Sequence, residues 1–366
     1  MVSRSLCPVP KTQKTCSGGT GTTCTGGTTF YEVTSTTRDK LGRITALTET
    51  TAAIPGGSGQ TTVTWGYTYD EAGRLKTVDK TGAAQIAYSY DANGNRTGAS
   101  GGEVITTGTI DGQDRLASQT RAGVTTTYTY TNNGSMLTST SPTAAWTYAY
   151  DLQGNLRSAT KSGTSITYLV DGRNRRVGKL GGALPAKYVY DDQLRIVAEL
   201  DVTSGAPTHV YAYGEKSNVP ELVYQPVTAK TYRIVSDVRG SVRLVLELPA
   251  SGTPVVRQRI DYDAWGLAIG LGLPGATESV NLTGDANFKR VSLGYAGGLW
   301  DRDTGFVRFG AKFPQCSGKL IQETFACCRQ ASGHHNDDDE DNPLVCPSPT
   351  SPKAKFERCL NENLFK

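Results

Sequence analysis

The chain has 366 residues, enough for one large or two ordinary domains, and 42 glycines, 18 tyrosines and many threonines favour strands joined by turns over helices. Its 38 basic and 34 acidic side chains leave a formal net charge of +4, so charge alone indicates neither a nucleic acid nor an anionic membrane as a partner. The sequence contains no run of 18 apolar residues, and a membrane-spanning helix is therefore not predicted.

Residues 1–29 form a low-complexity leader rich in Gly, Thr and Cys, which we interpret as a linker or a degraded repeat. The leader lacks the apolar stretch of a Sec signal and contains no phosphate-binding loop motif. No cysteine occurs between Cys24 and Cys316. The main body is therefore expected to fold without disulfides or thiolate metal sites.

A repeat of 20 to 21 residues dominates the next part of the chain. Its units include YDEAGRL, YDANGNR, YDLQGNL and YDDQLRI, with outlying copies RDKLGRI (38–44) and DYDAWGL (261–267). A fixed short period is typical of a repeat architecture. The ladder consists of Asp70, Asp91, Asp111, Asp151, Asp171 and Asp191, with Thr131 filling the one gap.

Each unit reads as strand, turn and strand. Tyrosines spaced by two, such as Tyr148 and Tyr150, place both rings on one face of a strand. The Asp that follows can accept hydrogen bonds from backbone N–H groups two or three residues on, and the Gly three residues later tolerates a positive φ. We therefore interpret the aspartates as turn formers without catalytic chemistry, and the tyrosines as packing residues. A curved, tyrosine-lined sheet that stacks sugars or peptides is the alternative.

The sequence offers little for catalysis or cofactor binding. Only three histidines occur, and His209 lies in the strand-like THVYAY, where we expect it to be packed or facing solvent. Cys328 with His334 or His335 is the least unfavourable nucleophile pair. We interpret the G-x-G-x-x-G formed by Gly270, Gly272 and Gly275 as a loop, because it contains a proline and lies among β repeats. No catalytic, cofactor-binding or metal-binding residue is predicted. The one tight basic cluster is interpreted as a solvated turn in preference to a phosphate contact, and it consists of Arg173, Arg175 and Arg176.

These repeats resemble the YD repeats of RHS and teneurin-type proteins. Two later stretches, VSDVRGSVRLVLELPASGTPVVRQRIDYDAWGLAIG (235–270) and LGYAGGLWDRDTGFVRFGAKF (293–313), resemble the RHS-associated core segment that closes such arrays. The resemblance covers roughly residues 30–313. It implies an all-β fold of repeated hairpins in a spiralling sheet that forms a hollow shell, and we expect this chain to form a partial, open one.

The resemblance also carries functional expectations. Bacterial members of the family enclose a variable C-terminal toxin, whereas animal members form extracellular scaffolds for adhesion. The core segment normally continues into Asp-Pro-rich motifs linked to self-cleavage by paired carboxylates. Here Lys312, Phe313 and Pro314 stand where that continuation should begin, and no such motif follows. Self-cleavage is therefore not expected.

We predict four regions: the leader 1–29, a YD-repeat β-shell 30–234, an RHS-associated core segment 235–313 and a variable Cys-rich, acidic tail 314–366. The tail could in principle assemble zinc ligands, but their spacing is poor, and a disulfide-stapled or disordered segment is favoured. A shifted reading frame is a third interpretation of the tail. The ligands considered are Cys327, Cys328, His334, His335, Cys346 and Cys359.

The leading hypothesis is a non-enzymatic shell fragment that encapsulates or presents a C-terminal polypeptide in a polymorphic toxin system. One alternative is an extracellular adhesion or glycan-binding scaffold that uses Tyr88 and Tyr148 for carbohydrate binding. A second alternative is a small toxin activity within the tail 314–366. A secreted or cell-surface location is expected. The expected partner is the C-terminal cargo, with a surface glycan or a secretion apparatus as further candidates and no nucleic acid, no membrane span and no cofactor.

Overall fold

The computed structural model describes residues 13–16, 19–21, 29–53, 60–101, 105–214, 219–251, 253–269, 278–280, 285–309 and 316–317. The described residues up to Ala87 belong to one compact unit, and those from Tyr88 onward belong to a second. Both units consist of strands, and the described residues contain one 3-10 turn (η2, Tyr295–Gly297) and no α-helix. The predicted all-β class is confirmed.

The first unit contains six strands, and a seventh crosses into the second unit. They are β1 (Gln13–Cys16), β2 (Gly19–Gly21), β3 (Thr29–Arg38), β4 (Ile44–Thr51), β5 (Thr61–Tyr69), β6 (Leu75–Lys80) and the crossing strand β7 (Ile86–Tyr90). Strands β3 to β7 pair antiparallel with their neighbours in chain order, and β1 pairs with both β2 and β3.

The strands of the second unit that form its wall also follow chain order. They are β8 (Arg96–Ser100), β9 (Ile105–Ile110), β10 (Leu116–Arg121), β11 (Val124–Tyr130), β12 (Met136–Ser141), β13 (Ala144–Tyr150), β14 (Leu156–Lys161), β15 (Thr164–Val170), β16 (Arg176–Leu180), β17 (Ala186–Tyr190), β18 (Ile196–Leu200), β19 (Pro207–Ala212), β20 (Leu222–Gln225), β21 (Lys230–Ser236), β22 (Val242–Glu247) and β23 (Val255–Arg259). Short strands follow: β24 (Asp261–Tyr262), β25 (Ala268–Ile269), β26 (Ser279–Val280), β27 (Leu299–Trp300), β28 (Phe306–Arg308) and β29 (Cys316–Ser317).

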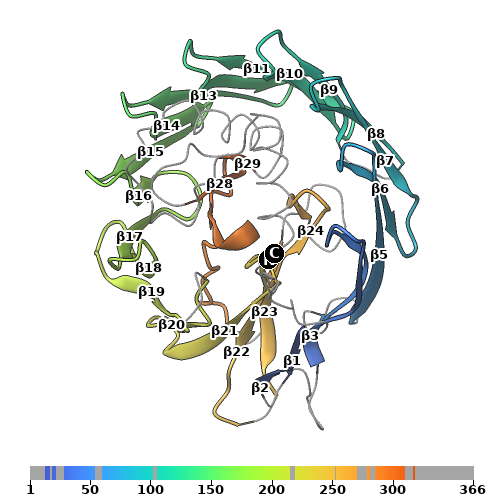
Figure 1. Cartoon of the computed structure of the whole chain (residues 1–366). Helices are drawn as coiled ribbons and strands as arrows, with labels where there is room; N and C mark the ends of the chain where they lie inside the picture. Colours follow the sequence, from blue (N-terminus) through green and yellow to red (C-terminus); the bar gives the residue numbers. More distant parts are fainter. Residues whose placement is uncertain are drawn as a thin grey trace, which may run out of the picture. The chain divides into compact units, whose positions relative to one another are not determined.

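From β8 to β23 every strand of this unit pairs antiparallel with the next, and β23 also pairs with β26. The resulting sheet curves, and β28 lies on its inner side (Figure 1). The sequence-based prediction of hairpins laid side by side is confirmed by this ladder.

An Asp turn, with the sequence Asp-x-x-Gly in several units, builds one of the two hairpin turns of the repeat. One carboxylate oxygen of Asp151 accepts the N–H groups of Gln153 and Asn155, two and four residues on, at 3.1 and 2.8 Å. The Asp151 carbonyl accepts the N–H of Gly154 at 3.0 Å, and Gly154 has a φ of 80°. The predicted bond to the residue two positions on is confirmed, whereas the second bond reaches the fourth residue here. Two-residue turns such as Ala122–Gly123, both at positive φ, close the hairpins at their other ends.

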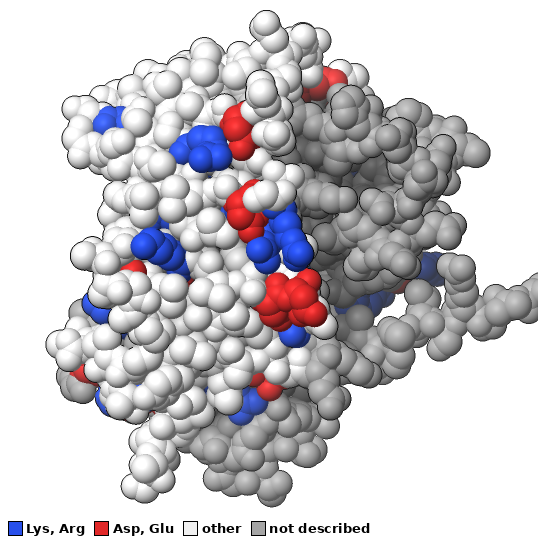
Figure 2. All heavy atoms as spheres, turned by 90° about the vertical axis from the view of Figure 1, so that its left-hand side faces the viewer, with Lys and Arg blue, Asp and Glu red and all other residues white. Residues whose placement is uncertain are grey.

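The two faces of the sheet differ in chemistry. In β13, Trp146 and Tyr148 are buried while Thr147 between them is exposed, as the period of two predicts. On the outward face, Thr and Ser hydroxyls bond across the strands, as between Thr129 and Thr138 at 2.7 Å. Figure 2 shows the side of the molecule that carries β15 to β19, where charged side chains are sparse among uncharged ones.

Candidate functional site on the inner face of the second unit

Four of the Asp turns are tied to the next repeat by a clasp of Asp, Arg and Tyr. Arg175 Nε donates to Asp171 Oδ2 at 2.7 Å, and its guanidinium lies 5.3 Å from the centre of the Tyr190 ring. The Tyr190 hydroxyl then donates to the Arg176 carbonyl at 2.8 Å. The clasp uses a charge-assisted bond, a cation–π contact and a hydrogen bond to couple neighbouring hairpins. The same clasp recurs in Asp39–Arg43–Tyr69, Asp111–Arg115–Tyr130 and Asp191–Arg195–Tyr213.

The clasp also sets the ionisation of its aspartate. Burial raises the pKa of Asp171, but the backbone and side-chain hydrogen bonds from Arg175 more than offset this, so the pKa lies below its usual value. Asp191 follows the same pattern, with Arg195 as the donor. Carboxylates held ionised by local donors suit a structural turn, which agrees with the interpretation of these residues from the sequence.

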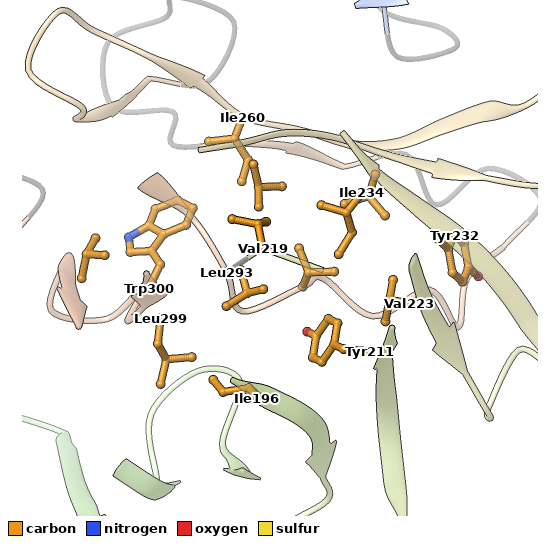
Figure 3. Close-up of a cluster of buried hydrophobic side chains, with 14 of the residues drawn as sticks. Ile196, Tyr211, Val219, Val223, Tyr232, Ile234, Ile260, Leu293, Leu299 and Trp300 are labelled. Carbon is orange, nitrogen blue, oxygen red and sulfur yellow. The ribbon is translucent and has the colours of Figure 1, made fainter. Parts of the chain in front are cut away.

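The inner face of the wall is covered by the chain's own residues 285–309, which we call the inner segment. Phe306 of this segment shares a buried cluster with Trp146, Tyr148 and Tyr168, and the Phe306 and Tyr148 ring centres are 5.2 Å apart. A second cluster joins Leu293, Leu299 and Trp300 of the inner segment to the wall (Figure 3). Its wall residues include Ile196, Tyr211, Val223, Tyr232, Ile234 and Ile260.

Polar contacts between the wall and the inner segment anchor this segment at several points along its length. Gln225 brackets the Lys289 backbone, donating to its carbonyl at 2.6 Å and accepting its N–H at 2.9 Å. Arg308 donates to the carbonyl of Asn174. Because buried polar groups need partners, these bonds fix where the segment lies as well as holding it. Further anchors are Tyr168 to Asp301 (2.6 Å), Lys179 to Asp301 (3.0 Å), Ser292 to Glu199 (2.9 Å) and Tyr232 to Asp285 (2.8 Å).

One of these anchors centres on Asp301, whose side chain is 1% exposed. Burial raises the pKa of Asp301. The Lys179 charge, the Tyr168 hydrogen bond and the Arg176 charge lower it by a larger amount, so the pKa of Asp301 lies below its usual value. Burial together with the Asp301 carboxylate raises the pKa of Tyr168 above its ordinary value. Asp301 is therefore a carboxylate held ionised in the interior of the protein.

A buried group of polar side chains surrounds Glu199 and lacks the geometry of a catalytic triad. Glu199 accepts the hydroxyls of Tyr211 and Ser292 at 2.6 and 2.9 Å, and His209 Nδ1 lies 3.4 Å from it. The serine hydroxyl is thus bonded to the carboxylate, whereas a nucleophilic serine would need the imidazole as its base. His209 Nε2 faces the Lys289 carbonyl at 3.3 Å. His209 is packed, which is one of the two positions predicted for it.

The structure also places the other residues considered from the sequence. Tyr88 and Tyr148 are only 8% and 3% exposed, so their rings are packed and present no stacking surface. Arg173 is exposed, in agreement with a solvated turn. Arg176 was wrongly included in that turn: it is 1% exposed, and its guanidinium lies 3.9 Å from the Tyr168 ring centre. It begins strand β16, where the alternation of faces turns it inward.

Several predictions concern residues outside the described part of the chain. These residues are Gly270, Gly272, Gly275, Lys312, Phe313, Pro314, Cys327, Cys328, His334, His335, Cys346 and Cys359. Among the residues that the structure does describe, no group of three or more His, Cys, Asp or Glu side chains could hold a metal ion. No helix in that part of the chain is long and apolar enough to cross a membrane.

Reasoning from the sequence missed the residues that hold the inner segment: Lys179, Glu199, Ser292, Asp301 and Asp303. One signal was available. The stretch Asp301–Gly305 repeats the turn chemistry of the ladder, because the Asp301 carboxylate accepts the Asp303 N–H at 3.0 Å and Gly305 has a φ of 78°. This stretch lies outside the 20-residue period of the repeat, so the sequence alone did not identify it as a repeat unit.

The chain-ordered hairpins and their clasps define a YD-repeat wall. The sequence matches the family model of the teneurin YD-shell over residues 23–332, and the chain belongs to this family.

Three solved structures are similar to part of this fold. The crystal structure of TcdB2-TccC3 is 11% identical with a TM-score of 0.34, over 80% of this chain and 23% of that one. The crystal structure of the same complex without its hypervariable C-terminal region is 10% identical with a TM-score of 0.32, over 79% of this chain and 22% of that one. The structure of a Photorhabdus luminescens Tc holotoxin pore with a TccC3 mutation is 15% identical with a TM-score of 0.33, over 79% of this chain and 19% of that one. The chain thus spans less than a quarter of the length of these chains. No curated protein matches the sequence.

Proposed function

We propose that this protein is a non-enzymatic YD-repeat shell fragment that encloses or presents its own C-terminal polypeptide in a toxin system of the RHS type. The observation that carries this proposal is the position of the inner segment. Residues 285–309 lie on the inner face of the wall, so the polypeptide that follows Phe309 starts from that face.

The contacts of the inner segment support the proposal that the wall encloses the downstream polypeptide. Strand β28 is buried, with Phe306 packed among wall residues, and β29 pairs with it further along the chain. A polypeptide that leaves from a buried, doubly anchored strand is directed along the inner face, where the wall restricts access of water and proteases. The partner is then the downstream polypeptide, and the location is secreted or at the cell surface. A glycan-binding role would need a surface other than the packed rings of Tyr88 and Tyr148.

Site-specific proteolysis tests the proposal. One variant carries a protease recognition sequence directly after Phe313, at the predicted start of the tail. A matched variant carries the same sequence in the exposed two-residue turn between Lys161 and Thr164. Cleavage depends on how often a site is accessible, so we expect the turn to be cut at least about tenfold faster than the tail.

Adding Phe306→Ala to the tail variant should raise its rate of cleavage, because the anchor of β28 against Tyr148 is lost. Equal cleavage rates at the tail and turn sites in the otherwise unchanged protein would refute the proposed enclosure.

A further inference from the structure

Three ionisable side chains meet where the inner segment touches the turn between β16 and β17. Lys179 Nζ lies 2.5 Å from Asp303 Oδ2 and 3.0 Å from Asp301 Oδ1. The side chains of Lys179, Asp301 and Asp303 are 5%, 1% and 15% exposed. An amine is therefore held against two carboxyl groups in surroundings that exclude most water.

We propose that Lys179 and Asp303 form an intramolecular isopeptide bond, with Asp301 as the group that carries the proton. The Lys179 ammonium first passes a proton to the Asp303 carboxylate through their short hydrogen bond. The neutral amine nitrogen then lies within hydrogen-bond distance of a carboxylic acid oxygen, and this fixed placement favours attack on the neighbouring carboxyl carbon.

The reaction balances without any further reagent. The Lys179 nitrogen bonds to the Asp303 carboxyl carbon, and the C–OH bond of Asp303 breaks. One N–H proton moves from Lys179 to Asp301 and from there to the departing hydroxyl group, which leaves as water. The products are an amide and an Asp301 carboxylate, so the net charge of the cluster is unchanged.

The surrounding groups suit each role. The Ala183 N–H donates to both carboxyl oxygens of Asp303, at 3.1 and 2.9 Å, and can stabilise the negative charge that develops on one of them during attack. Asp301 is held in place by the Tyr168 hydroxyl at 2.6 Å. Gly182 lets Asp303 approach, because a Cβ at Gly182 would lie 2.6 Å from an Asp303 carboxylate oxygen.

The bond would join two residues that are 124 positions apart, one in the wall and one in the inner segment. Such a link would hold the inner segment on the wall even when the surrounding contacts loosen. It therefore adds a covalent step of maturation to the shell, and it does not depend on what polypeptide the shell encloses.

Mass spectrometry of the purified full chain tests the proposal. We expect an intact mass one water lower than the sequence requires, and a tryptic digest in which Lys179 is uncleaved and its peptide is branched to the one containing Asp303. A full-sequence mass with normal cleavage after Lys179 would overturn the proposal, because the contact would then be an ion pair only.

Variants separate the roles. Lys179→Met and Asp303→Ala should both restore the full mass, while Lys187→Met, which changes a lysine on the next strand, should retain the loss of water. Asp301→Asn keeps the size of the side chain but cannot accept the proton, and most molecules should then remain unlinked. Full linkage in Asp301→Asn would refute the role given to Asp301. Should a variant fail to fold, the digest of the unchanged protein decides.

Discussion

Leu194 occupies a turn position that the backbone reserves for glycine, and its replacement by glycine should stabilise the protein. Leu194 has a φ of 63°, while Gly154 holds the equivalent place in another repeat with a φ of 80°. A residue with a Cβ loses about 1–2 kcal/mol in this conformation. The greater freedom of glycine in the unfolded chain offsets about 0.5–1 kcal/mol of that gain. Leu194→Gly should therefore be more stable than Leu194→Ala by about 1 kcal/mol.

The alanine variant is the matched control, because both substitutions remove the same exposed side chain and only alanine keeps a Cβ. The mirror change Gly154→Ala should destabilise by a similar amount, since no atom lies within 4 Å of the added carbon and only the backbone conformation matters. Urea unfolding at constant slope measures the differences. If Leu194→Ala proves as stable as Leu194→Gly, the left-handed conformation does not limit stability and the reasoning fails.

Three further outcomes are expected. Tyr190→Phe removes the hydroxyl from one clasp and should lower the free energy of unfolding by about 1 kcal/mol in urea titrations, with an unchanged far-UV spectrum; no loss would show that the clasp does not couple the repeats. Phe306→Ala should cost about 3–5 kcal/mol, measured in the same way, and a cost below about 1 kcal/mol would mean that the inner segment is not packed as described. The pKa of Asp171 lies below the unfolded value of 3.8, so its stabilising contribution is complete above that value and is lost as pH falls through the lower folded value. The urea midpoint should therefore drop in acid, and Asp171→Asn should reduce that drop; an equal drop in both proteins would remove Asp171 as a cause.

The wall could be predicted from the sequence because its determinants are local. An Asp turn is specified within five consecutive residues, as from Asp151 to Asn155, and the spacing of Tyr148 and Tyr150 assigns a face to each strand. Pairing only between chain neighbours then follows from the short turns. Periodicity is therefore enough to give the fold class and the order of the strands.

The site could not be predicted because its contacts link distant parts of the chain. Lys179 and Asp303 meet across 124 residues, and nothing near Lys179 distinguishes it from a lysine on the solvent side of a strand. Arg176 was misplaced for a related reason: three arginines in four positions suggest a turn, but the third begins a strand and faces inward against Tyr168. Burial of a charged side chain depends on its partners, which the local sequence does not contain.

Pairing restricted to chain neighbours also bears on how such walls can change in size. From β9 to β22 each strand pairs, among the described strands, only with the one before and the one after it, so duplication or loss of a whole hairpin there would leave every other strand register intact. Unequal exchange between units can then lengthen or shorten the wall in steps of one hairpin. The contacts around Asp301 and Phe306 limit this freedom, because units inserted between β13 and β20 would move the anchor points of the inner segment apart.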